Sequence, residues 1–165
     1  MSSLNILFIC TGNIFRSMTA EYALKAALSF DAIHTVHSAG MTDAPHEIVS
    51  FVADYLKGRG LDISPHQPKK LTREMLDEAD LAIAMGTEHR HQINRTFSRC
   101  LPLFSEIAYG TEEPLRDVYE VVPDWRNNEA AASAYGQSVM DYIFDGMPNF
   151  ITRMHSFVQV RRMPA

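Results

Sequence analysis

Cysteine and long apolar runs are both scarce in this sequence. The 165 residues include only two cysteines, Cys10 and Cys100, too few for the disulfide framework of a small secreted domain. No apolar run approaches the roughly 18 residues that a membrane-spanning helix needs, and the N-terminus carries no signal-peptide pattern. We therefore expect a soluble protein in a reducing compartment, the cytoplasm, with no membrane partner.

Positive charge is also limited. Lys and Arg number 15 against 20 Asp and Glu, which gives a net charge of -5. Because nucleic-acid binding normally requires a basic surface, we expect no nucleic-acid partner. The seven histidines are scattered along the chain, so the sequence predicts no metal site and no other cofactor. The length suits one domain over residues 1–165, and nothing in the sequence indicates an oligomeric state.

The informative features gather near the N-terminus. Residues 4–9 (Leu-Asn-Ile-Leu-Phe-Ile) are typical of a strand buried on both faces, and residues 19–28 are rich in helix formers. Cys10, Gly12 and Arg16 lie between them. A strand, a tight loop and a helix N-terminus direct backbone N–H groups and the positive end of a helix dipole at one point. The sequence therefore predicts an anion-binding loop at residues 10–17.

The residue types in this loop suit phosphoryl transfer. A cysteine at a helix N-terminus beside a cation is expected to be a thiolate, which makes Cys10 the candidate nucleophile. Arg16 offers a planar fork for two phosphate oxygens. Ser17 can donate a hydrogen bond to the sulfur, and Asn13 can brace the loop. The predicted phosphate-binding residues are Thr11, Gly12, Asn13, Ile14, Phe15, Arg16 and Ser17.

The pattern Cys-x5-Arg-Ser after an N-terminal strand, with Gly12 and Asn13 inside it, resembles the low-molecular-weight protein tyrosine phosphatases. The resemblance covers nearly the whole chain. It implies hydrolysis of phosphotyrosyl proteins through a phosphocysteine on Cys10, without a cofactor. It also implies that Asp124, in the segment 121–125, is the general acid.

The same resemblance assigns supporting roles. Ser38 and His66 are expected to support the phosphate loop together with Asn13 and Ser17. His46 and Trp125 are expected on the wall of the substrate cleft, although a solvated loop residue and a core residue are equally consistent with their positions.

Several positions depart from the family pattern. Phe15 stands where many members carry a second cysteine, and Gly86 stands where the family commonly has Asp. Ile14 stands where relatives that act on phosphoarginine have Thr, which favours an aryl phosphate. The alternatives are a phosphoarginine phosphatase, an arsenate reductase on the same fold, and a non-catalytic phosphate-binding module.

The order of predicted elements indicates an α/β fold. Strands and helices alternate along the chain, which predicts a single-domain, doubly wound, four-stranded parallel sheet with helices on both faces. Residues 100–104 are the expected fourth strand, at an edge because of Pro102, with Cys100 as a packing residue. An amphipathic segment over residues 128–159 is expected to break near Pro148.

Overall fold

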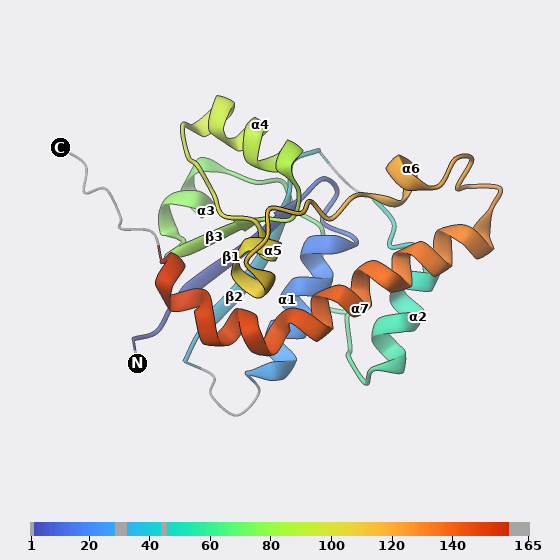
Figure 1. Cartoon of the computed structure of the whole chain (residues 1–165), viewed down its shortest axis with the longest axis horizontal. Coiled ribbons are helices and arrows are strands. Elements are labelled where there is room, and N and C mark those ends of the chain that lie inside the picture. The colour runs from blue at the N-terminus through green and yellow to red at the C-terminus, as the bar shows by residue number, and fades with distance from the viewer. Residues whose placement is uncertain (1, 29–32, 44–45, 159–165) are drawn as a thin grey trace.

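A parallel sheet forms the centre of the molecule (Figure 1). The computed structural model describes residues 2–28, 33–43 and 46–158. The strands of this sheet are β1 (Asn5–Cys10), β2 (Thr35–Gly40) and β3 (Leu81–Ala84), in the order β2-β1-β3. Because β1 lies between the other two and is covered on both faces, it is almost entirely apolar. Its last residue, Cys10, lies beside Gly40 at the carboxyl edge of the sheet, where ligands bind in folds of this class.

Alternate residues of β1 face two different helical layers. Ile6 and Phe8 pack in one core with apolar residues of α1 (Arg16–Ala27) and α7 (Glu129–Arg153). Leu7 and Ile9 face the opposite core, which includes Leu76 and Ile93. The sheet is therefore covered on both faces, and the predicted doubly wound α/β class is confirmed.

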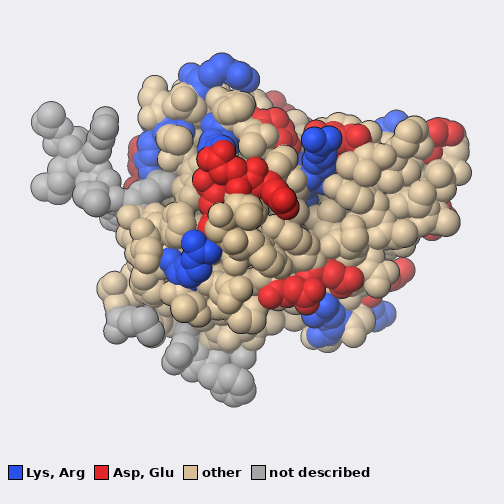
Figure 2. Space-filling view, in the orientation of Figure 1, with Lys and Arg blue, Asp and Glu red and all other residues tan. Residues whose placement is uncertain are grey.

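The shorter helices complete these layers and the carboxyl edge of the sheet. They are α2 (Ser50–Gly58), α3 (Arg73–Glu78), α4 (Thr87–Phe97), α5 (Phe104–Tyr109), α6 (Val118–Val121) and the 3-10 helix η1 (Met154–Phe157). Helices α1, α2, α5 and α6 all contact the long α7, which passes across α1 and α2 in Figure 1. Acidic and basic side chains lie in small separate groups on the face shown in Figure 2.

The structure corrects three expectations. The predicted fourth strand is reduced to a single bridge between Ala84 and Leu103, because Pro102 has no N–H to donate and α5 begins directly after Leu103. Helix α7 continues through Pro148 instead of breaking there. Cys100 is exposed rather than packed in a core. Among the described residues, no helix is both long and apolar enough to cross a membrane.

Candidate active site

A cavity of about 350 Å³ opens at the carboxyl end of β1, and we call it the Cys10 cavity. Residues of the predicted phosphate loop form its floor. Side chains from α2 and the segment before it, and from α6 and the segments on either side of it, form its walls. The lining residues are Cys10, Thr11, Gly12, Ile14, Phe15, His46, Glu47, Val49, Phe51, Val52, Asp117, Val118, Tyr119, Trp125 and Arg126. The structure thus brings the predicted loop and both predicted wall residues, His46 and Trp125, to one cavity.

Asn13 holds the loop in shape from the inside. It is fully buried and adopts a left-handed conformation with φ 58°, which asparagine tolerates better than most residues. Its Oδ1 accepts a hydrogen bond from the backbone N–H of Lys69 at 3.2 Å. Its Nδ2 donates to Ser17 Oγ at 3.0 Å and to Ser38 Oγ at 2.7 Å. One side chain therefore ties the loop to α1, to β2 and to the segment before α3.

These bonds determine which hydroxyl groups near Cys10 accept a hydrogen bond and which are free to donate one. Ser38 donates its hydroxyl proton to the buried carboxylate of Glu21, which can only accept. Both serine oxygens accept from Asn13, so the hydroxyl proton of Ser17 can go to the Cys10 sulfur or, over a longer 3.5 Å contact, to the backbone carbonyl of Ala39. Cys10 Sγ lies 2.9 Å from Ser17 Oγ. The network thus presents a hydrogen-bond donor to a thiolate at Cys10.

Two further residues support the loop from behind. His66 donates from Nε2 to the backbone carbonyl of Asn13 at 2.7 Å, so it acts on the loop and not on substrate. Gly40 lies so close to the loop that a Cβ there would be 2.7 Å from the backbone oxygen of Thr11. Nothing in the sequence indicates this close approach. Gly40 is not among the glycines with positive φ, so its backbone conformation does not require glycine.

Arg16 is fully buried and held by several acceptors. Its Nη1 donates to Leu115 O at 2.6 Å and to Glu88 Oε1 at 3.2 Å. Its Nη2 donates to Thr11 Oγ1 at 3.2 Å and to Asp117 Oδ2 at 2.9 Å. Burial favours the neutral form of Arg16, but the negative charges of Cys10, Asp117 and Glu88 outweigh it and raise the pKa of the guanidinium.

The Nε of Arg16 is the exception in this arrangement. It is buried and has no hydrogen-bond partner among the described residues. A buried, charged donor without a partner is costly in a folded protein. An oxyanion bound in the loop would supply the missing acceptor, so the chemistry of this site fits a phosphoryl group.

His89 was not predicted as a site residue, but it contacts the loop. The backbone N–H of Gly86 donates to Nδ1 of His89 at 3.0 Å, and Nε2 lies 2.9 Å from Thr11 Oγ1. Burial, followed by the positive charge of Arg16, lowers the pKa of His89 to about 3. A neutral ring that accepts at Nδ1 carries its proton on Nε2, so His89 donates to Thr11.

The structure does not place Asp124 where a general acid would act. Asp124 is exposed, has φ 52°, and accepts a hydrogen bond from Asn127 Nδ2 at 2.8 Å. Its side chain stabilises a turn before α7, and the cap of α7 is Asn128. Asp124 does not line the Cys10 cavity.

Asp117, from the segment before α6, lies at the Cys10 cavity instead. It lines the cavity, contacts Arg16 and caps α6 through a 2.7 Å hydrogen bond from the backbone N–H of Val118 to Oδ1. Glu120 Oε2 in turn accepts from the backbone N–H of Asp117. This reciprocal Asp-x-x-Glu pattern is a recognisable signal for the start of a helix, and it could have placed Asp117 at the N-terminus of a short helix.

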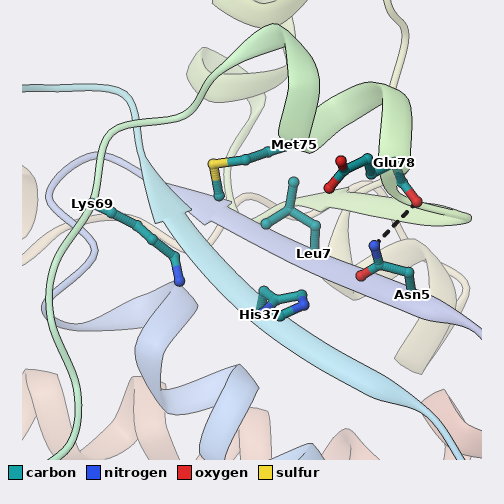
Figure 3. A pocket seen from close by; sticks show the side chains of 6 residues that line it. All are labelled: Asn5, Leu7, His37, Lys69, Met75 and Glu78. Atoms are coloured by element: carbon teal, nitrogen blue, oxygen red, sulfur yellow. Dashed lines mark hydrogen bonds between the residues drawn. The ribbon is translucent and has the colours of Figure 1, made fainter.

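A second cavity, of about 240 Å³, lies beside the opposite face of β1 (Figure 3). Asn5, Leu7, His37, Lys69, Met75 and Glu78 line it. Burial, with a smaller effect of Lys69, lowers the pKa of His37. None of these side chains lines the Cys10 cavity. Leu7 belongs to the core on one face of the sheet, whereas Cys10 belongs to the core on the other face.

The fold and the site define an α/β protein with a Cys-x5-Arg-Ser loop at the carboxyl end of its central strand. A family model described as low molecular weight phosphotyrosine protein phosphatase matches residues 5–108. The chain therefore belongs to the low-molecular-weight protein tyrosine phosphatase family.

Two curated relatives illustrate the range within this family. The chain is 38% identical over 98 residues to the low molecular weight protein-tyrosine-phosphatase Ptp of Acinetobacter johnsonii, which is 56% of this chain and 64% of that protein. It is 31% identical over 98 residues to a protein-arginine-phosphatase of Bacillus subtilis (strain 168), which is 58% and 65% of the two chains. The chain thus spans less than two thirds of the length of either relative.

Solved structures match over more of the chain. A YwlE mutant from Bacillus subtilis superposes with a TM-score of 0.77 at 22% identity, over 92% of this chain and 99% of that chain. A low molecular weight protein tyrosine phosphatase from T. tengcongensis superposes with a TM-score of 0.75 at 26% identity, over 90% and 98%. These likenesses extend beyond the segment matched by the family model.

Proposed function

We propose that the protein, as one domain over residues 1–165, hydrolyses phosphotyrosine in protein substrates through a phosphocysteine intermediate. One arrangement supports this most. Cys10, with Ser17 as its hydrogen-bond donor, lies at the floor of a cavity that Arg16 and Asp117 approach from other elements. A nucleophile, a cation for the phosphoryl oxygens and a carboxylic acid are the groups that the reaction needs.

The first step transfers the phosphoryl group. The Cys10 thiolate attacks phosphorus as the bond from phosphorus to the tyrosine oxygen breaks. Arg16 and the loop N–H groups bind the phosphoryl oxygens, where charge is spread in the transition state. Asp117 in its protonated form gives its proton to the leaving oxygen, so tyrosine departs neutral.

The second step regenerates the enzyme. Asp117, now a carboxylate, takes a proton from water, and the resulting hydroxide oxygen forms a bond to phosphorus as the sulfur leaves. Inorganic phosphate is released. Ser17 stabilises the departing thiolate by donating its hydroxyl proton in a hydrogen bond. A cysteine that must stay reduced for each cycle suits the cytoplasm.

The walls of the cavity favour an aryl phosphate. Ile14 and Phe15 of the loop, with Tyr119 and Trp125 of the walls, line the cavity with apolar or aromatic surface, which suits the ring of tyrosine. A phosphoarginine substrate is the second candidate, because one relative is named a protein-arginine-phosphatase. Its guanidinium would have to lie against the apolar side chain of Ile14.

A substrate comparison tests this assignment. We expect kcat/KM for a phosphotyrosine peptide to exceed that for the matching phosphoarginine peptide. The Ile14→Thr variant should narrow the difference by raising activity toward phosphoarginine. A wild-type preference for phosphoarginine would replace phosphotyrosine as the proposed substrate.

A further inference from the structure

Gly86 directly precedes α4, and its neighbours leave no room there for a side chain. Its φ of -139° and ψ of 162° are extended backbone that any residue adopts, so conformation does not require glycine here. The carboxylate of Glu88 lies directly against it. A Cβ on Gly86 would be 2.5 Å from Glu88 Oε2 and 2.7 Å from Oε1. A side chain at position 86 and the Glu88 carboxylate therefore compete for one space.

From this space Glu88 reaches the catalytic arginine. Its Oε1 lies 3.2 Å from Nη1 of Arg16 and 3.3 Å from Nε2 of His89. Arg16 is fully buried, whereas 45% of the Glu88 side chain is exposed. An ion pair between two exposed side chains contributes little, but here one partner is buried and must keep a fixed direction to bind an anion.

The two carboxylates on Arg16 have different freedom to move. Asp117 contacts Nη2, and the proposed reaction requires it to turn toward the leaving oxygen. Glu88 contacts Nη1, beside the backbone carbonyl of Leu115. When Asp117 acts on substrate, Glu88 and Leu115 remain to hold the guanidinium by its Nη1 end.

We propose that Glu88 is a positioning residue whose carboxylate fills the space left by Gly86 and orients Arg16 toward the phosphoryl group. The inference rests on the proposed function, since it assigns a role within that reaction. The unpartnered Nε, and Nη2 once Asp117 turns toward the leaving oxygen, are then the donors available to the anion. An aspartate at position 86 would carry its carboxylate into the same space.

The experiment compares four proteins with the wild type. They are Glu88→Ala, Gly86→Ala, the double variant Gly86→Asp with Glu88→Ala, and Glu74→Ala. Glu74 is the matched control, because it is exposed and is the second residue of α3 as Glu88 is the second residue of α4. Titration calorimetry gives the affinity for inorganic phosphate, and p-nitrophenyl phosphate gives kcat/KM.

We expect Glu88→Ala to weaken phosphate binding and to lower kcat/KM, each by roughly 10-fold to 100-fold, because a displacement of about 1 Å in a binding group can cost about 10²-fold. Gly86→Ala should lower both as well, since its methyl group displaces the Glu88 carboxylate while the charge remains. The double variant should recover most of the loss, and Glu74→Ala should change neither value.

A different pattern would overturn the proposal. If Glu88 only added negative charge, its removal would leave phosphate affinity unchanged or would tighten it. Full activity in Gly86→Ala would also contradict positioning by Glu88, and this variant decides the matter if the double variant does not fold. A double variant that folds but recovers neither phosphate affinity nor kcat/KM would also contradict positioning by Glu88. A wild type without turnover would refute the proposed function, while the phosphate affinities would still decide the role of Glu88.

Discussion

Asp117 Oδ2 lies 2.9 Å from Nη2 of Arg16, although the two residues are 101 positions apart in the sequence. The fold brings the acid of one wall to the cation of the phosphate loop. A carboxylate next to this arginine can serve a substrate bound in the same cavity, whereas Asp124 bonds to its own turn. This relationship determines which acid the proposed mechanism uses.

The leaving group should reveal the role of Asp117. Asp117→Asn should lower kcat for phosphotyrosine by roughly 10²-fold or more, because general acid catalysis typically contributes about 10²–10⁴-fold. The loss should be much smaller for p-nitrophenyl phosphate, whose leaving group needs no proton. Steady-state rates on both substrates measure this difference.

Asp124→Asn is the matched control for this comparison. It should leave both rates nearly unchanged, because Asp124 does not line the Cys10 cavity. Equal losses on the two substrates in Asp117→Asn would mean that Asp117 only caps α6 and holds Arg16. A selective loss in Asp124→Asn would restore the acid inferred from the sequence.

A methyl group at Gly40 should disturb the phosphate loop. The added Cβ would lie 2.7 Å from Thr11 O and 3.1 Å from Asn13 N, and these backbone atoms cannot move aside as a flexible side chain can. We expect Gly40→Ala to lower the free energy of unfolding by about 1–3 kcal/mol and to lower kcat/KM. Denaturant unfolding and rates with p-nitrophenyl phosphate test both effects.

Gly58→Ala provides the comparison for Gly40. Nothing lies within 4 Å of a Cβ at this position, at the end of α2. Alanine there should leave activity unchanged and should not lower stability. If Gly40→Ala behaves like Gly58→Ala, the close approach of β2 to the loop has no energetic importance.

His89 should make the protein less stable in acid. Burial and the charge of Arg16 lower its pKa from 6.5 to about 3 in the folded state. Between these pH values the unfolded chain binds a proton that the folded chain does not, so the free energy of unfolding falls as pH falls. This group contributes a slope of at most about 1.4 kcal/mol per pH unit, and the loss is absent above the unfolded pKa.

Two variants isolate this contribution. His89→Asn keeps an acceptor for the Gly86 N–H but removes the titrating ring, so its stability should depend less on pH between about pH 4 and pH 6.5. His91→Asn replaces an exposed histidine two positions later and should keep the wild-type slope. Urea unfolding at several pH values measures the slopes. Identical slopes in all three proteins would show that His89 titrates normally.

The features that could be predicted from the sequence are those that residues close together in the chain determine. The phosphate loop, its brace by Asn13 and the buried strand before it follow from one continuous segment. The prediction of a fourth strand was wrong. Pro102 has no backbone N–H to donate, and among the described residues of this segment the pairing is reduced to the bridge between Leu103 and Ala84. The choice between Asp117 and Asp124 depended on how residues 115–128 turn, and a sequence pattern does not fix which carboxylate in such a segment faces the loop. The sequence also did not indicate Glu88, because its proposed role depends on how its carboxylate folds back into the space beside Gly86.

The most direct test of the central claim is the Cys10→Ser variant. We predict that wild-type protein turns over p-nitrophenyl phosphate and phosphotyrosine peptides, and that Cys10→Ser loses this turnover while still binding inorganic phosphate through Arg16 and the loop N–H groups. Calorimetry and steady-state rates on the same two proteins give both answers. Residual activity above about a tenth of the wild-type rate, far more than loss of a covalent nucleophile permits, would contradict a phosphocysteine mechanism. Phosphate binding by a wild type without turnover would identify a non-catalytic phosphate-binding module.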